Sequence, residues 1–430
     1  MTRDEDNEVD GSFSTTCKKC PVCPRRMSSL TLYFNYLEYI ISINLSQQVQ
    51  VKNSKEYTPM SEDEIYLSFV GWLNKHWWKM PETDHLLPSF KTFFTKEEAQ
   101  LLTGFPFMPT ELGELAQLKK MDSGVLTEQL AALAQKGVVW KTKRGENLWF
   151  HLNDAFFIFF RGSFYSPSPG EKTIALAQPL NKYLHEGVMA QLAPAHNKPL
   201  RTVPVQRTVE DPRKILPHED VLLLVDSQDF FALSHCACRQ RKKLDPDSVS
   251  CNHPLETCIH LGKLAHYMVE NELSRQVSKE EVLELLEKTA DAGLVHAVSN
   301  WEKDADTICN CCRCSCLFFE SFYVYGQDKS HDHSNYRVKI NGQTCKGCGL
   351  CVQRCPMEAL QLKESSPKEG QKKITELIAP DRCLGCGLCV HKCPTQSLTL
   401  EQRTEITNPP QTMGEWAKRW AADHKKAQTN

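Results

Sequence analysis

Two stretches near the C-terminus, CKGCGLCVQRCP (345–356) and CLGCGLCVHKCP (383–394), repeat one pattern of cysteine, glycine and proline. In each of them, two residues separate the first three cysteines from one another, three residues precede the fourth, and a proline follows it. The offset between the copies is the same at every cysteine. This duplication predicts two equivalent cysteine sites within one small domain.

The spacing of these cysteines has a chemical reason. Three thiolates at this spacing can wrap one face of a four-iron cubane, and the intervening glycines let backbone N–H groups approach its sulfides. A turn that the proline fixes carries the fourth cysteine away. Residues 338–402 resemble the two-cluster 4Fe-4S ferredoxin of bacteria along their whole length. Two four-cysteine zinc sites are the alternative, although zinc needs neither the Gly-Cys-Gly packing nor the duplicated proline.

The resemblance to this ferredoxin implies which cysteines hold each cluster. In that family the fourth cysteine of one run binds the cluster of the other run. One cluster would therefore be held by Cys345, Cys348, Cys351 and Cys393. The other would be held by Cys383, Cys386, Cys389 and Cys355. Between the two halves, residues 361–377 are expected to form a hairpin exposed to solvent.

A second concentration of cysteine lies between residues 236 and 316 and includes five within ICNCCRCSC (308–316). Thiolates this close together repel one another unless a cation neutralises them, so we expect a metal here. The predicted ligands are Cys236, Cys238, Cys251, Cys258, Cys309, Cys311, Cys314 and Cys316. Cys312 is the weakest candidate, because adjacent cysteines rarely both reach one small cluster. At least one further 4Fe-4S cluster is favoured, with structural zinc as the alternative.

The segments that lead to these cysteines, DVLLLVDSQDFFAL (220–233) and GLVHAV (293–298), are apolar enough to be neighbouring buried elements. Consecutive residues of a strand point to opposite faces of a sheet, so a strand would divide the cysteines between two faces. We therefore expect ICNCCRCSC to be a loop wrapped around its metal. Three nearby side chains are either donors that tune the site or surface charges, namely His235, Arg239 and Arg241.

Residues 95–155 show the order helix, helix, helix, hairpin. Thr95 and Glu98 form a capping box, and the third helix ends at Gly137. This order, and LAALAQKGVVWK (130–141) in particular, resembles the winged-helix family, whose members bind DNA or dock proteins. Acidic residues match basic ones in number across residues 95–165, so we do not expect nucleic acid as the partner.

The composition of the whole chain is that of an ordinary globular protein, with a net charge of −2 over 430 residues. Its 20 cysteines are too few for a small secreted disulfide scaffold. The N-terminal MTRDEDNEVDG is acidic where a secretory signal is basic and then apolar. We therefore predict a cytoplasmic protein without a membrane span, in a compartment where clustered cysteines bind metal.

These observations predict an α+β multidomain protein with a winged-helix-like N-terminal domain, a Cys-rich α/β central domain and a C-terminal two-cluster ferredoxin-like domain. The first residues, including CKKCPVC (17–23), are interpreted as a disordered extension, and the folded part is expected to begin near Met60. The expected segments are an extension (1–59), a winged-helix-like domain (60–165), a Pro-rich connecting arm (166–217), a Cys-rich metal-binding domain (218–334), the ferredoxin domain (335–404) and a tail (405–430).

The order of these parts, with CACR (236–239) before ICNCCRCSC, resembles a family of anaerobic 4Fe-4S ferredoxin-domain proteins and leaves the reaction open. The chain has no Gly-rich dinucleotide fingerprint, P-loop or nucleophile elbow. We therefore expect a protein that passes single electrons to or from a partner oxidoreductase. Two alternatives stay open, an enzyme with a substrate-binding central cluster and a redox-responsive winged-helix regulator.

Overall fold

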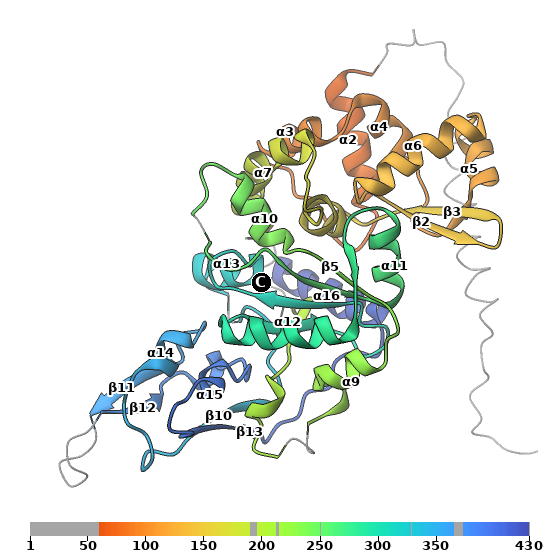
Figure 1. Ribbon diagram of the computed structural model, residues 1–430. Coiled ribbons are helices and arrows are strands. Elements are labelled where there is room, and N and C mark those ends of the chain that lie inside the picture. The colour runs from red at the N-terminus through yellow and green to blue at the C-terminus, as the bar shows by residue number, and fades with distance from the viewer. Residues whose placement is uncertain are drawn as a thin grey trace, which may run out of the picture. The chain divides into compact units, whose positions relative to one another are not determined.

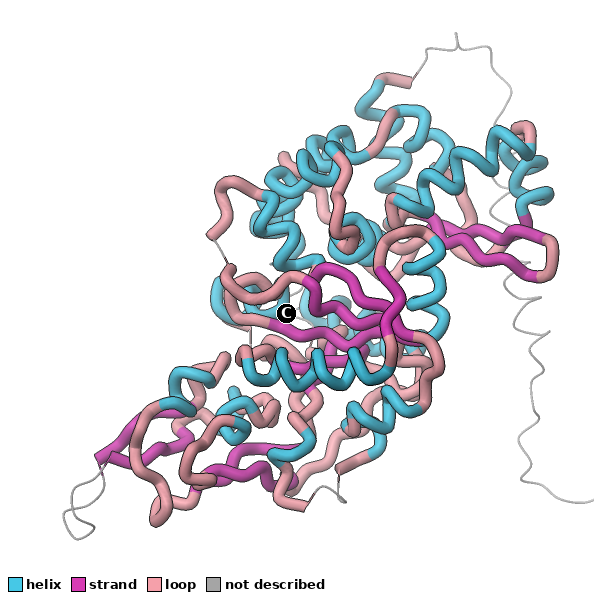
Figure 2. Tube along the Cα trace, in the orientation of Figure 1, coloured by secondary structure: helices cyan, strands magenta, loops and turns pink. Residues whose placement is uncertain are grey.

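A six-stranded antiparallel sheet lies at the centre of the computed structural model, with strand order β4-β8-β9-β6-β5-β7 (Figure 2). The structure describes residues 60–189, 196–211, 215–249, 251–327, 329–364 and 373–429. The strands are β4 (Leu200–Thr202), β5 (Phe231–His235), β6 (Glu256–Leu261), β7 (Arg275–Val277), β8 (Val295–Ser299) and β9 (Thr307–Cys311). Residues 1–59, with CKKCPVC and the expected extension, lie outside the described residues.

The two faces of this sheet differ in chemistry. One face packs aliphatic side chains such as Leu233, Ile259 and Ile308 against α12 (Lys279–Asp291) and α9 (Val221–Asp226). The opposite face carries Cys258, Cys309 and Cys311, because these residues alternate with the aliphatic ones along β6 and β9. The helices α9 and α12 therefore cover the aliphatic face of the sheet, and the cysteines lie on the other face.

The N-terminal part is mainly helical (Figure 1). Its elements are α2 (Glu62–Leu73), α3 (Leu86–Phe93), α4 (Lys96–Leu102), β1 (Thr110–Glu111), α5 (Leu112–Lys119), α6 (Ser123–Gln135), β2 (Val139–Arg144) and β3 (Asn147–Leu152). The capping box of Thr95 and Glu98 is confirmed at the start of α4. The strands β2 and β3 form a hairpin after α6, and β1 adds to the edge of β3.

The expected connecting arm takes part in the central sheet. It contains α7 (Glu171–Tyr183) and β4, and β4 pairs with β8. Further along the chain, α10 (Ala237–Leu244) follows β5, α11 (Gly262–Glu270) follows β6, and α13 (Leu317–Tyr325) follows β9. The described residues thus combine helices with separate sheets, which confirms the α+β class.

The C-terminal part is built from two similar halves. β10 (Tyr336–Ile340) pairs with β13 (Leu398–Gln402), and β11 (Leu360–Glu364) pairs with β12 (Lys373–Leu377). A short helix begins one residue before the third cysteine of each run, α14 (Leu350–Arg354) in one half and α15 (Leu388–His391) in the other. The antiparallel pairing of β11 with β12 confirms the expected hairpin between the halves.

The expected tail contains the helix α16 (Met413–Thr429). Its Trp416 and Trp420 are buried in the same core as Trp78 of the N-terminal part. The ring centroid of Trp416 lies 5.1 Å from that of Trp77. The last helix therefore packs against the beginning of the described chain. Every helix in the described ranges is too short or too polar to traverse a membrane.

A buried histidine on β8 predicts that the fold loses stability in acid. Burial lowers the pKa of His296 from 6.5 to about 4, and its Nε2 lies 3.2 Å from the hydroxyl of Thr289. Because the unfolded chain takes up this proton first as the pH falls, the stabilisation is complete above pH 6.5 and is lost progressively toward pH 4. The loss at pH 5 is about 2 kcal/mol.

The His296→Gln variant should show a smaller drop in the free energy of unfolding between pH 7 and pH 5, measured by urea denaturation. His266→Gln is the control, because His266 is exposed. An equal acid-dependent drop in the parent and in both variants would contradict the role of His296.

Candidate metal centres and the adjoining cavity

The eight ferredoxin cysteines lie in two groups of four. Cys355, Cys383, Cys386 and Cys389 line one small pocket, which we call the inner pocket. Cys345, Cys348, Cys351 and Cys393 line another, which we call the outer pocket. Each pocket thus receives three cysteines from one run and the fourth from the other, which is the crossed arrangement that the resemblance implies.

Glycines in these runs allow a very close approach of the backbone. Gly347, Gly385 and Gly387 have φ values of 62°, 70° and 80°, which side chains rarely tolerate. A Cβ at Gly385 would lie 2.2 Å from the carbonyl oxygen of Tyr336, and one at Gly347 would lie 2.1 Å from that of Lys373. Both loops can therefore close around their pockets only with glycine at these positions.

The backbone and the burial of the two pockets suit metal-bound thiolates. The N–H of Ala359 donates to Sγ of Cys355, and that of Ser397 donates to Sγ of Cys393, each at 3.3 Å. These equivalent bonds favour the charged thiolate. Burial, in contrast, raises the pKa of the Cys386 thiol to about 12. A bound cation would offset this cost, so the residues fit a cluster with four thiolate ligands.

Six of the central cysteines form one buried group, which we call the six-thiol group. Their thiols are neighbours in the order Cys236–Cys238–Cys316–Cys311–Cys309–Cys258. They come from the end of β5, the first turn of α10, β6, β9 and the residue before α13. The sheet and the starts of two helices thus bring together cysteines that are far apart in the sequence.

The prediction that ICNCCRCSC forms a loop is wrong for the first half of this stretch. Residues Thr307–Cys311 form the strand β9, which pairs with β6 and β8. Cys309 and Cys311 are two residues apart and share one face, while Asn310 accepts a hydrogen bond from Thr289 on the side of α12. Consecutive strand residues do alternate in direction, but here Ile308 and Asn310 occupy the opposite, buried face toward α12, so the strand presents both cysteines to one site.

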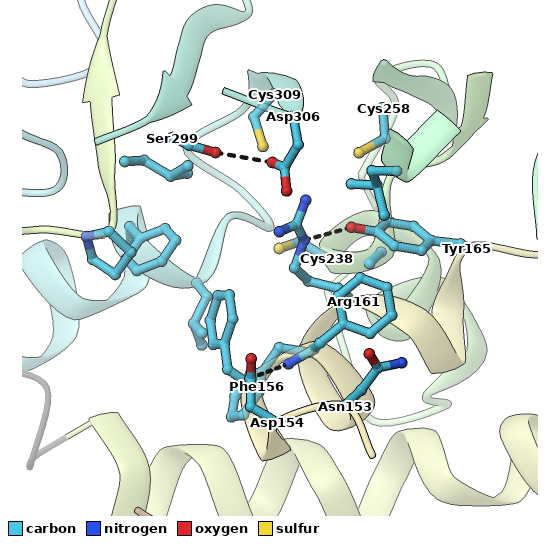
Figure 3. Close-up of a pocket in the computed structure, with 18 of the residues that line it drawn as sticks. Asn153, Asp154, Phe156, Arg161, Tyr165, Cys238, Cys258, Ser299, Asp306 and Cys309 are labelled. Carbon is cyan, nitrogen blue, oxygen red and sulfur yellow. Dashed lines mark hydrogen bonds between the residues drawn. The ribbon is translucent and has the colours of Figure 1, made fainter. Parts of the chain in front are cut away.

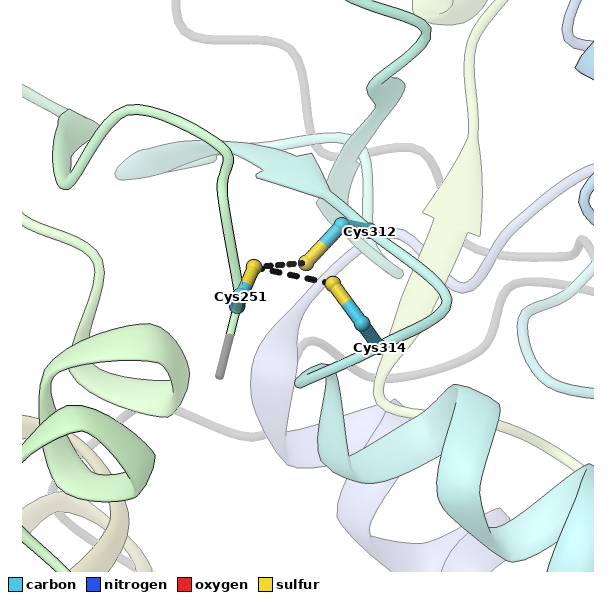
Figure 4. A group of neighbouring side chains, drawn as sticks. All are labelled: Cys251, Cys312 and Cys314. Atoms are coloured by element: carbon cyan, nitrogen blue, oxygen red, sulfur yellow. Dashed lines mark hydrogen bonds between the residues drawn. The ribbon is translucent and has the colours of Figure 1, made fainter. Parts of the chain in front are cut away.

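The other three cysteines form a separate group near the surface (Figure 4). Sγ of Cys251 lies 2.8 Å from Sγ of Cys314 and 3.8 Å from Sγ of Cys312. Cys314 is exposed. Cys312, the weakest candidate from the sequence, therefore lies beside two predicted ligands, and the nine cysteines divide into six and three.

Of the three charged candidates beside CACR, Arg239 has the clearest role. Its guanidinium is buried and donates from Nη1 to the carbonyl oxygen of Asn310 at 3.0 Å and to Sγ of Cys312 at 3.5 Å. Arg241 is buried as well, and the ring of His235 is hydrogen-bonded to Gln240. For Arg239 and Arg241, the alternative of ordinary surface charges is wrong, because both follow Cys238 on α10 into the interior.

His331 is a functional candidate that the sequence did not reveal. One of its ring nitrogens lies within 4.8 Å of Sγ of both Cys311 and Cys316. Its Nδ1 lies 3.0 Å from the hydroxyl of Ser330, which in turn donates to Sδ of Met357 at 3.5 Å. Met357 lines the inner pocket. A buried series of side chains therefore connects the six-thiol group with the inner pocket.

A cavity of about 340 Å³ adjoins the six-thiol group (Figure 3). All six thiols of that group line it, and aromatic side chains from the N-terminal part and from α16 form much of the remaining wall. Its polar groups include Arg161, Tyr165 and Asp306, which come together beside Cys238, Cys258 and Cys309 in Figure 3. The sequence did not single out these three polar residues, since no motif surrounds them.

Comparison with known families finds one match, which covers the C-terminal cysteine runs. The sequence model of the 4Fe-4S dicluster domain matches residues 344–397. Comparisons with curated proteins and with solved structures find no match. The match supports a C-terminal ferredoxin-like iron–sulfur domain that binds 4Fe-4S clusters and takes part in electron transfer.

Proposed function

We propose that this chain is an iron–sulfur electron-transfer protein with two clusters in the ferredoxin part and a third at the six-thiol group. When bound, such clusters supply transfer of single electrons. Cys355, Cys383, Cys386 and Cys389 would hold the inner cluster, and Cys345, Cys348, Cys351 and Cys393 the outer one. Four members of the six-thiol group would hold the third cluster. The other two thiols and His331 would then lie beside it.

The observation that carries this proposal is a single buried cluster of side chains between the metal centres. It contains Cys309, Cys311 and Cys316 of the six-thiol group together with Cys355 and Cys386 of the inner pocket. Phe318, Phe319, Met357 and Leu384 fill the space among them. Close packing of apolar side chains keeps water out of this region and holds the two centres at a constant separation.

Arg354 fastens the ferredoxin part to the central domain. Its Nη1 and Nη2 donate to the carbonyl oxygens of Asp291 and Ala290, at 3.0 and 2.7 Å, and its Nε donates to the carbonyl oxygen of Leu388 at 3.0 Å. A cation at the last carbonyls of α12 is also favoured by the helix dipole. One side chain therefore ties α12 to both cysteine runs, which is the rigid joint that electron transfer between fixed centres requires.

The outer pocket provides the contact with a partner in this proposal. Cys348 is exposed, whereas Cys355, Cys386 and Met357 lie toward the interior. A redox partner protein or oxidoreductase complex would exchange electrons at the outer pocket, and the winged-helix-like part would serve as a docking module. Nucleic acid is not part of the proposal, because β2 and β3, whose residues the structure describes in full, carry only three lysine or arginine residues, Lys141, Lys143 and Arg144.

Metal analysis of the full-length protein, purified without oxygen, tests the proposal. We expect about twelve irons and twelve sulfides per chain, from three four-iron clusters. Cys309→Ala combined with Cys311→Ala and Cys316→Ala leaves only three thiols in the six-thiol group, too few for a four-cysteine cluster, and should lower the iron content to about eight. The matched control is Cys314→Ala, which removes an exposed thiol of the separate group of three and should leave the iron content unchanged.

The alternative outcome is equally clear. A parent protein with about eight irons and stoichiometric zinc, with the zinc lost in the Cys309/Cys311/Cys316 triple variant, would make the central site structural. The proposed third cluster would then be wrong, and the iron–sulfur assignment would be limited to the ferredoxin part.

A further inference from the structure

We propose that the cavity beside the six-thiol group is a binding site for a small aromatic carboxylate, with Arg161 as the residue that holds the carboxylate. The inference deepens the proposed function and rests on it only for the redox role of the site. The binding itself depends on the cavity and its polar residues. A ligand placed here would lie directly against the proposed third cluster.

The size and the walls of the cavity suit an aromatic ring. Its volume of about 340 Å³ falls within the range of roughly 300–1,000 Å³ that is usual for small-molecule sites. Trp77, Phe107, Phe156, Phe160 and Trp416 contribute to the wall. Aromatic side chains bind a planar ring through offset stacking or edge contacts. The cavity also extends well beyond the thiols, to residues of the N-terminal part.

Arg161 supplies an unpaired positive charge at the sulfur end of this cavity. Its Nε donates to the hydroxyl of Tyr165 at 2.6 Å, and its Nη2 donates to the hydroxyl of Thr307. Among the described residues, no carboxylate forms an ion pair with it. Asp306 lies nearby and accepts a hydrogen bond from the hydroxyl of Ser299 at 3.1 Å. Asp306, Cys258 and Cys309 lie near enough to favour the charged form of this guanidinium. Among the described residues, its Nη1 makes no hydrogen bond, which leaves that nitrogen for an anion in the cavity.

A carboxylate fits this arrangement better than a neutral group does. The planar guanidinium donates in a fork that matches two carboxylate oxygens. The Tyr165 hydroxyl accepts from Arg161 and keeps its own proton for donation to a ligand. Burial raises the pKa of Tyr165 well above its ordinary value, so this proton stays in place at neutral pH. Together the two side chains offer donors at one edge of an otherwise aromatic cavity.

The sulfur end of the cavity gives such a ligand a redox neighbour. Cys238, Cys258 and Cys309 lie around the Arg161 guanidinium in Figure 3. A carboxylate held by Arg161 would therefore lie beside the six-thiol group, with its ring toward the aromatic wall. The opposing possibility is that Arg161 only balances the negative charge of the thiolates, and the experiment below separates the two.

Calorimetric titration of the metal-loaded, full-length protein with benzoate and with benzamide tests the proposal. The two probes share a ring and a planar head group but differ in charge. We expect benzoate to bind at least tenfold more tightly than benzamide to the unaltered protein. Arg161→Gln should remove this preference, and Tyr165→Phe, which keeps the ring, should reduce it severalfold. Arg144→Gln is the control, since Arg144 is an exposed guanidinium stacked on Trp149 and should change nothing.

Iron analysis of the same samples separates this inference from the proposed function. Equal binding of the two probes, or a benzoate preference that survives Arg161→Gln, would overturn the inference and leave Arg161 as a counter-charge. Benzoate preference in a protein with about eight irons and zinc would support the binding site while overturning the third cluster. With about twelve irons, benzoate should also alter the electron paramagnetic resonance signal of the central cluster, and an unchanged signal would contradict its proposed place.

Discussion

The Cys355→Ala variant is expected to lose about four irons, and these should come from the cluster of the second cysteine run. Cys355 is close in sequence to Cys345, Cys348 and Cys351, but its side chain lines the inner pocket with Cys383, Cys386 and Cys389. Removing its thiol leaves three ligands at the inner pocket and all four at the outer pocket. Electron paramagnetic resonance and iron analysis of the full-length protein would measure the loss.

Double variants give the sharpest form of this test, because losses from one cluster do not add. Cys355→Ala with Cys383→Ala should lose no more iron than Cys355→Ala alone. Cys355→Ala with Cys345→Ala should lose about eight irons, since the two thiols belong to different pockets. If the second pair lost only about four irons, Cys355 would belong to the outer pocket and the crossed assignment would be wrong.

The Gly385→Ala variant is expected to be one of the most damaging single changes outside the cysteines. The new Cβ would lie 2.2 Å from the carbonyl oxygen of Tyr336 on β10, and φ at this position is 70°. The left-handed conformation alone costs about 1–2 kcal/mol for a residue with a side chain. The forced displacement of β10 or of the cysteine loop should bring the total to about 3 kcal/mol or more. Thermal unfolding should shift accordingly, and the inner pocket should lose iron.

Gly326→Ala is the matched control for this prediction. Gly326 has a similar φ of 64°, at the end of α13, but a Cβ there would meet no atom within 4 Å. Its substitution should therefore cost only the conformational part, about 1–2 kcal/mol, and leave the iron content unchanged. Equal destabilisation by the two variants would mean that the close approach to Tyr336 is not what requires glycine at position 385.

The ferredoxin part could be predicted from the sequence because its information is local. Cysteine, glycine and proline recur at fixed spacing, and one duplicated pattern accounts for both pockets. The capping box at Thr95 is local in the same sense, since Glu98 lies one helical turn away. Where the interacting residues are a few positions apart, the chemistry of the site can be deduced before the fold is known.

The central site could be predicted only in outline, because the fold assembles it from distant segments. Cys236, Cys258 and Cys316 meet through the order of strands in the sheet, which no spacing in the sequence encodes. The strand β9 was mistaken for a loop, although Cys309 and Cys311 have the two-residue spacing that places side chains on one face. This two-residue spacing was the signal in the sequence that could have assigned Cys309 and Cys311 to one group.

Arg161 could not be identified from the sequence for a related reason. It stands in the aromatic run FFIFFRGSFY (156–165), and its hydrogen-bond partner Thr307 and its neighbour Asp306 are distant in the sequence. The one indication in the sequence is the charge itself. An arginine at the end of a strongly apolar run is costly to bury, and such a residue is kept where it has a specific task.

Helix α16 closes one side of the cavity with residues that lie far along the chain from the rest of its wall. Met413 and Trp416 form part of the cavity wall, and Trp416 packs against Trp77 and Trp301. On this side, the separation of the six-thiol group from solvent therefore depends on the packing of indole rings. Loss of the indole at position 416 would open the group to water without breaking any strand pairing of the central sheet.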